Sequence, residues 1–205
     1  VERKPQVNPL GKLVVIIDPG HGGEDPGASQ KFNGKPVVED EYVYDVALRL
    51  ERMVTSLGGA AYLTIIETNL KSKIIRNWDP QQIFPHEETE VFSLDKKKVV
   101  AGRQGLIKRV IFANRKAVEL RWKTPVFISI HFDELERRPD IQGVRIIAPE
   151  PSALAAFLWE SFGSEGRRRA EFPFVESPDP GHGIRDLFVL RSHNKIGQKV
   201  LIELG

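Results

Sequence analysis

The sequence predicts a single α/β domain, in which a mostly parallel central sheet carries helices on both faces. Short runs of β-branched and apolar residues at 14–17, 126–130 and 200–204 are typical of strands that are buried on both sides. The segments between such runs place apolar residues at spacings of three and four, which is the pattern of amphipathic helices. At 205 residues without an internal repeat, the chain fits one domain spanning residues 1–205.

The first half of the chain begins with the strand at residues 14–17. A loop rich in glycine and proline follows at 18–27, where the backbone can approach a ligand closely. Acidic residues at 39–41 start a helix that runs to Leu57, and Gly58-Gly59 provides its C-terminal cap. Residues 60–66 are expected to form the next strand.

Residues 68–100 are polar and lack regular apolar spacing, so we expect a long surface excursion there. The second half of the chain then resumes the alternation of helices and strands. The predicted helices are 103–118 and 152–162, and the predicted strands are 126–130, 144–148, 187–190 and 200–204.

Composition excludes several classes of protein. The 30 basic and 28 acidic residues leave a formal charge of only +2, so we do not expect a nucleic-acid partner. Without cysteine, the chain has no disulfides or thiolate ligands, and a metal would have to be bound by His, Asp or Glu. No apolar run approaches the ~20 residues of a membrane span. The sequence starts at Val1 without a recognisable export signal.

Chemically reactive residues follow the predicted buried strands. His21 comes after the first strand and its short loop, His131 directly follows the 126–130 strand, and Glu203 lies in the last strand. Because parallel strands end at one edge of a sheet, these side chains can converge, and Glu39 at a helix start can join them. Two histidines and a carboxylate are the ligands of a catalytic zinc ion with an open coordination position. A further acid beside them would serve as general base.

Each residue also has an ordinary structural explanation. Histidines at strand ends are often hydrogen-bonded structural residues, and acids at helix starts complement the helix dipole. Glu41 competes with Glu39 for the ligand role. His182 and His193 are alternative ligands, but their turn-like neighbours favour surface positions. Glu203 differs, because an ionisable group in a buried apolar strand needs a partner or a function.

The motif from Val15 to Ala28, VIIDPGHGGEDPGA, closely resembles the opening motif of the zinc-dependent N-acetylmuramoyl-L-alanine amidases of the amidase type 3 family. Further resemblances follow in order along nearly the whole chain. They comprise Glu39 eight residues before Ala47, Ala113-Asn114-Arg115, the 127–133 segment, Gly143-Val144, the 187–191 segment and the 201–205 segment.

The resemblance implies specific roles. It assigns zinc binding to His21, Glu39 and His131, and the catalytic base to Glu203. It further implies hydrolysis of the amide between N-acetylmuramic acid and L-alanine of peptidoglycan, in the periplasm or outside the cell. We expect Arg191 to contact carboxylates of the stem peptide. Family members commonly continue past the final glutamate into another helix, so we expect that this helix is missing or that the fold closes differently.

Two other functions remain open at this stage. The same residues would serve a zinc carboxypeptidase or endopeptidase that cleaves elsewhere in the stem peptide. A wall-binding module without turnover is the alternative from outside the enzymes. No feature of the sequence identifies a regulatory protein.

Overall fold

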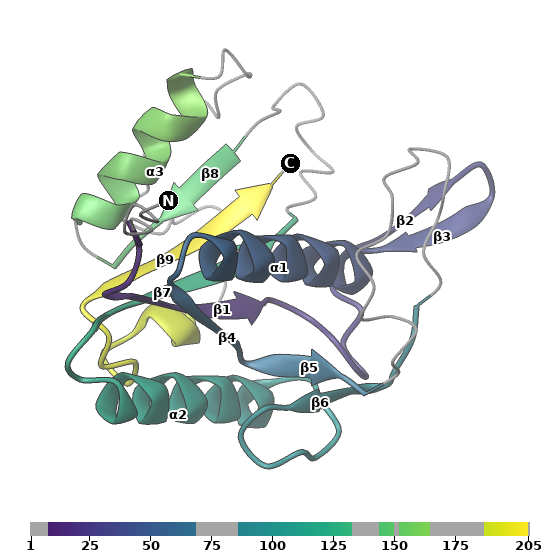
Figure 1. Cartoon of the computed structure of the whole chain (residues 1–205). Coiled ribbons are helices and arrows are strands. Elements are labelled where there is room, and N and C mark those ends of the chain that lie inside the picture. The colour runs from purple at the N-terminus through teal and green to yellow at the C-terminus, as the bar shows by residue number, and fades with distance from the viewer. Residues whose placement is uncertain (1–7, 69–85, 133–143, 150–151, 165–186, 205) are drawn as a thin grey trace, which may run out of the picture.

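The central sheet confirms the predicted α/β fold. The computed structural model describes residues 8–68, 86–132, 144–149, 152–164 and 187–204. Its main sheet has the strand order β4-β1-β7-β9-β8 (Figure 1). The strands are β1 (Leu13–Pro19), β4 (Ala60–Leu63), β7 (Thr124–His131), β8 (Val144–Ile147) and β9 (Gln198–Leu204). All neighbours are parallel except β8, which pairs antiparallel with β9 at one edge.

Helices cover both faces of this sheet, as predicted. Helices α1 (Glu39–Ser56) and α3 (Ala153–Ser164) lie on one side, and α2 (Arg103–Glu119) lies on the other (Figure 1). Successive residues of β1 alternate between the two layers: Val15 and Ile17 pack toward α1, whereas Val14 and Ile16 pack toward α2. Both layers bury apolar side chains, which explains why the strand has no polar face.

Helix α1 begins and ends where its residues predict. Three acidic residues occupy its first turn, where they complement the helix dipole. The helix ends before Gly58, whose φ of +83° is a conformation that glycine adopts without steric cost. The first residue of the helix, Glu39, lies at the edge of the sheet where β7 ends, because its side chain accepts the N–H of Phe132.

The predicted strand at 60–66 is split. Thr64 separates β4 from a short strand β5 (Ile65–Glu67), which leaves the main sheet and pairs antiparallel with β6 (Glu90–Phe92). The described part of the 68–100 excursion therefore contains regular structure, while residues 69–85 lie outside the described residues.

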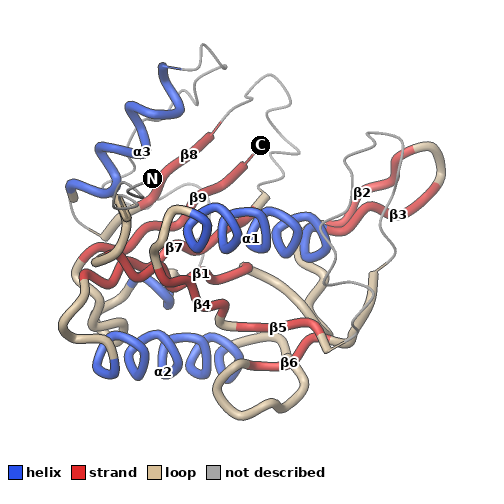
Figure 2. Tube along the Cα trace, viewed as in Figure 1, coloured by secondary structure: helices blue, strands red, loops and turns tan. Residues whose placement is uncertain are grey.

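A small β-hairpin was not predicted from the sequence. Strands β2 (Ser29–Phe32) and β3 (Lys35–Val38) project beyond the N-terminal end of α1 (Figure 2). The turn at Asn33-Gly34 has positive φ values of 51° and 77°, as a two-residue hairpin turn requires.

The prediction of a strand at 187–190 is wrong. Phe188–Leu190 form a 3-10 helix, η1, whose three side chains are buried in the core on the α2 side. Strand β9 already has β7 and β8 as neighbours on its two edges, so no position beside it is free for another strand. In the described part of the chain, no helix combines the length and apolarity needed to cross a bilayer.

Candidate metal centre and catalytic site

Three predicted ligands meet at the C-terminal edge of the sheet. His21, Glu39 and His131 each offer a ligand atom, and these atoms lie within 4.8 Å of one another. His21 Nε2 is 3.3 Å from Glu39 Oε2, and His131 Nδ1 is 3.2 Å from Glu39 Oε1. The two imidazole rings stand edge to face with centroids 5.0 Å apart. The carboxylate of Glu39 therefore lies between the two histidines.

Backbone hydrogen bonds hold this carboxylate in place. Glu39 Oε2 accepts the N–H of Ala28 at 2.9 Å, and Glu39 Oε1 accepts the N–H of Phe132 at 2.9 Å. Ala28 ends the loop that carries His21, and Phe132 directly follows His131. One carboxylate thus joins the first turn of α1 to both histidine-bearing segments.

Two glycines leave the space that the predicted ligands occupy. A Cβ atom on Gly20 would overlap the imidazole ring of His131. A Cβ atom on Gly27 would lie 2.6 Å from Glu39 Oε2 and 2.7 Å from the ring of His21, and Gly27 has a φ of +68°. Both contacts are too short for a real side chain, so the loop must carry glycine at these positions.

A buried ion pair supports the strand ends below the histidines. Asp18 accepts hydrogen bonds from Thr64 Oγ1 at 2.5 Å, Ser129 Oγ at 2.8 Å and Arg109 Nη1 at 2.8 Å. Arg109 also donates to the carbonyl of Pro19. This network was not predicted from the sequence, although an aspartate directly after four apolar strand residues indicates a side chain that needs buried partners.

The charges of the ligand group are strongly coupled. Burial alone would lower the pKa of His21, but hydrogen bonds and charge from Asp25 and Glu39 raise it to about 9. Burial of Glu39 is likewise outweighed, because both histidines hold the pKa of its carboxyl well below the usual value. His21 Nδ1 lies 3.1 Å from Asp25 Oδ1, which places a carboxylate on the ring nitrogen that faces away from Glu39. Such outer carboxylates orient metal-binding histidines.

Glu203 lies beside His131 in the sheet. The two residues are direct partners in the β7-β9 ladder, and Arg145 is the partner of Glu203 on the β8 side. Neighbouring partners in a sheet project to the same face, so Glu203 and His131 share a face at the edge where the strands end. Only 3% of Glu203 is exposed, as expected for an ionisable residue within an apolar strand.

Other predicted residues lie elsewhere. Arg191 is exposed after η1, and its described backbone contacts are with Phe188 and Asn194, so its contact with a stem peptide stays a prediction. His193 is exposed and stacks on Phe188, which confirms the predicted surface position. His182 lies outside the described residues.

Glu41 is directed away from the two histidines. Its Oε1 accepts the N–H of Glu87 at 2.7 Å, and with Asp40 and His86 it forms a second group whose potential metal-ligand atoms lie within 4.8 Å of one another. The structure thus brings Glu39, and not Glu41, to His21 and His131. His86, which carries no sequence motif, was not predicted to lie near this site.

The fold and the site together define an α/β protein with a two-histidine, one-carboxylate centre at the end of a parallel sheet. The family model for N-acetylmuramoyl-L-alanine amidase matches residues 15–205, and the chain belongs to this family. A probable cell wall amidase, LytH of Staphylococcus aureus, is 37% identical over 57 residues. That match covers 28% of this chain and 19% of the relative, so the chain matches only about a fifth of that protein.

Solved structures share the fold. N-acetylmuramoyl-L-alanine amidase AmiC2 of Nostoc punctiforme superposes with a TM-score of 0.56 at 22% identity, over 95% of this chain and 79% of that one. An N-acetylmuramoyl-L-alanine amidase from Clostridium difficile 630 gives a TM-score of 0.59 at 18% identity, over 94% and 79% of the two chains. At these identities the likeness concerns the fold.

Proposed function

We propose that this protein is a zinc-dependent N-acetylmuramoyl-L-alanine amidase, which hydrolyses the amide between N-acetylmuramic acid and L-alanine in peptidoglycan. The observation that carries the proposal is the convergence of His21, Glu39 and His131 at the strand ends, with Glu203 as the sheet partner of His131. Membership of the amidase family supports the same reaction and the same substrate class.

The donor set suits zinc. Two imidazole nitrogens and one carboxylate oxygen form a three-ligand group that leaves a fourth position for water or substrate. The outer contacts fit as well, because Asp25 approaches His21 and two backbone N–H groups hold Glu39. When bound there, zinc supplies a Lewis acid that lowers the pKa of water to about 7 and polarises the scissile carbonyl.

The side chains of the protein have two roles in this reaction, metal binding and proton transfer. His21, Glu39 and His131 hold the centre, and their positions are set before substrate arrives. Glu203 accepts a proton from the water as its oxygen attacks the amide carbon, and then gives that proton to the departing nitrogen of L-alanine. The C–N bond breaks, and the products are the lactyl carboxylic acid on the glycan and a peptide with a free amino terminus.

The substrate class also indicates where the protein works. Peptidoglycan lies outside the cytoplasm, so we infer a periplasmic or extracellular location. Residues 1–205 act as one catalytic domain in this proposal. Of the alternatives from the sequence, a stem-peptide carboxypeptidase or endopeptidase would cleave a different bond, and a binding module would cleave none.

Digestion of purified peptidoglycan tests the proposal. The zinc-loaded protein, Glu203→Gln and the surface control Glu119→Gln are each incubated with the polymer, and the released fragments are identified by mass spectrometry. We expect stem peptides that begin with L-alanine from the protein and the control but not from Glu203→Gln. Fragments cut within the stem peptide would identify a peptidase, and zinc binding without release would identify a binding module.

A further inference from the structure

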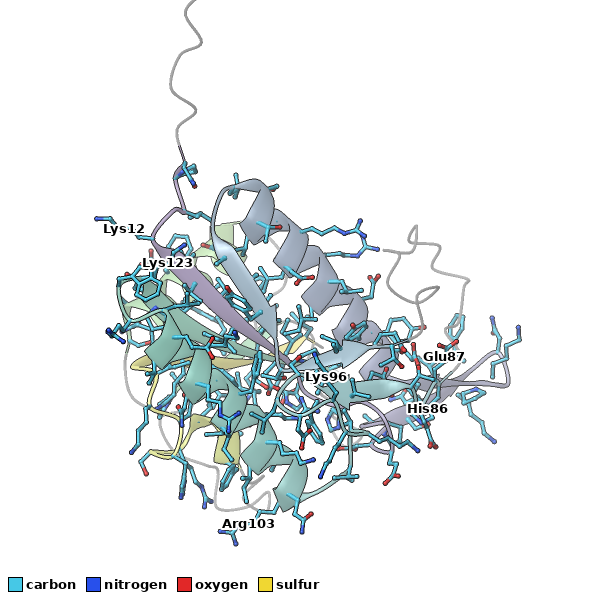
Figure 3. The ribbon with its side chains drawn as sticks, turned by 60° about the horizontal axis from the view of Figure 1, so that its bottom comes forward. Lys12, His86, Glu87, Lys96, Arg103 and Lys123 are labelled. Atoms are coloured by element: carbon cyan, nitrogen blue, oxygen red, sulfur yellow. The ribbon has the colours of Figure 1, made fainter. Side chains whose placement is uncertain are left out.

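The described end of the 68–100 excursion contacts two segments that carry residues of the candidate metal centre, namely the His21 loop and the first turn of α1. It continues through residues 86–89 into β6, whose first residue is Glu90. His86 and Glu87 lie beside the N-terminal end of α1 (Figure 3), where they contact Asp40 and Glu41. None of these excursion residues is a proposed ligand or base.

Glu90 holds the loop that carries His21. It is 3% exposed, and its Oε2 accepts the N–H of Gly23 at 2.9 Å, two residues beyond His21. Gly23 has a φ of +61°, and a Cβ on it would lie 2.6 Å from the carbonyl oxygen of Val99. The backbone of this loop is thus enclosed between the side chain of Glu90 and the chain that follows β6.

The same segment holds the turn that carries Glu39. His86 Nδ1 lies 2.8 Å from Asp40 Oδ2, and the N–H of Glu87 donates to Glu41 Oε1 at 2.7 Å. The side chain of Asp40 is fully buried. Asp40 and Glu41 directly follow Glu39 in α1, so these contacts hold the first turn of the helix.

We propose that residues 86–90 form a positioning clamp for the metal ligands. The clamp fixes the His21 loop through Glu90 and the Glu39 turn through His86 and Glu87, and so sets the separation of two ligands that lie on different elements. It acts through these backbone segments and makes no contact with zinc or substrate. The inference rests on the proposed function, because it requires that His21 and Glu39 bind zinc.

A positioning role has a distinct physical consequence. Contacts that fix ligand orientation typically change metal affinity by about 10- to 100-fold when they are lost. A contact that only stabilises the fold would lower the free energy of unfolding of the metal-free protein without changing the affinity of the folded protein for zinc. Metal affinity and coordination geometry therefore separate the two roles.

The same segment supplies a matched control. Glu88 lies between the clamp residues, but its side chain is 52% exposed and pairs with Lys98 at 2.9 Å. Glu88 approaches His86 Nε2 only at 4.0 Å and reaches the His21 loop only through Lys98, which also pairs with Glu24. Glu88→Gln therefore removes the same charge from the same stretch of chain and keeps the hydrogen bonds to Gly23 and Glu41. Glu90→Gln keeps an oxygen that can accept the Gly23 N–H, whereas Glu90→Leu removes the acceptor at similar volume.

The test measures zinc dissociation constants by competition with a chromophoric chelator, and the visible absorption of the cobalt-substituted protein. Circular dichroism and thermal unfolding of each metal-free variant establish that it is folded. We expect Glu90→Leu and His86→Ala to bind zinc about 10- to 100-fold more weakly and to shift the cobalt bands. Glu90→Gln should fall between Glu90→Leu and the unchanged protein, and Glu88→Gln should stay within about twofold of it.

Two results would overturn the proposal, and they are distinguishable. If the unchanged protein binds zinc and the folded variants match it in affinity and cobalt spectrum, the clamp is wrong and the proposed function stands. If the unchanged protein binds no zinc at all, the proposed function fails and the clamp fails with it.

Discussion

The buried ion pair of Arg109 and Asp18 should contribute more to the free energy of unfolding than an exposed ion pair of the same protein. Arg109→Met removes the charge partner of Asp18 and the donor to the carbonyl of Pro19, while it keeps most of the side-chain volume. Only 3% of Arg109 and 1% of Asp18 are exposed. The hydroxyls of Thr64 and Ser129 would remain as the described hydrogen-bond partners of a carboxylate that has lost its cation.

The expected cost follows from burial. Removing one partner of a buried ion pair costs about 3–5 kcal/mol, because the remaining charge stays desolvated. Arg49 and Asp45 on α1 form a pair of similar length, 2.7 Å against 2.8 Å, but their side chains are 40% and 12% exposed. For such an exposed helical pair, Arg49→Met should cost only about 0.3–0.5 kcal/mol.

Urea unfolding of the metal-free proteins, followed by circular dichroism, measures both free energies without a contribution from metal binding. The account predicts that Arg109→Met loses several times more free energy of unfolding than Arg49→Met. Equal losses in the two variants would refute the conclusion that the Arg109–Asp18 pair supports the strand ends beneath the site.

Three further predictions concern the proposed ligands directly. Gly20→Ala should abolish stoichiometric zinc binding in metal analysis, because its Cβ would overlap the ring of His131, whereas Gly197→Ala has open space and should bind normally; equal zinc content would contradict this steric argument. In the metal-free protein, His21 has a pKa raised from 6.5 to about 9, so its stabilising contribution is complete below about pH 6.5 and is lost as the pH rises through 9. Glu39 has a pKa lowered from 4.5, so its contribution is present above about pH 4.5 and is lost under acid. The contribution of His21 and Glu39 to the free energy of unfolding, measured by urea unfolding across pH, should therefore be greatest between about pH 4.5 and pH 6.5. A maximum above pH 9 would contradict these pKa shifts. Zinc affinity should increase as the pH rises toward 9, because the metal competes with the proton for His21.

The convergence of the site could be predicted because it follows from topology. Buried parallel strands have a recognisable composition and end at a common edge of the sheet. His131 directly follows one such apolar run and Glu203 lies within another, so the sequence was enough to place the two side chains together. Side-chain chemistry left Glu39 and Glu41 as competitors. The geometry of the first helical turn decides between them, because it directs Glu39 to the histidines and Glu41 to Glu87.

The remaining features depend on contacts between distant parts of the chain. Asp18 and Arg109 are 91 residues apart, and neither local pattern identifies the other as its partner. The apolar run at 187–190 correctly indicated burial, but burial does not distinguish a strand from a 3-10 helix. The β2-β3 hairpin is different, because its Asn33-Gly34 turn is a local signal that was overlooked.

The most direct test of the central claim is a zinc titration of activity on a soluble muramyl peptide. Metal-free protein receives increasing zinc, and the rate of appearance of a peptide with L-alanine at its amino terminus is measured by mass spectrometry. The account predicts no release without metal, a rise that ends at one zinc per chain, and no release by zinc-loaded Glu203→Gln. Undiminished release from the chelated protein, or from Glu203→Gln, would contradict it.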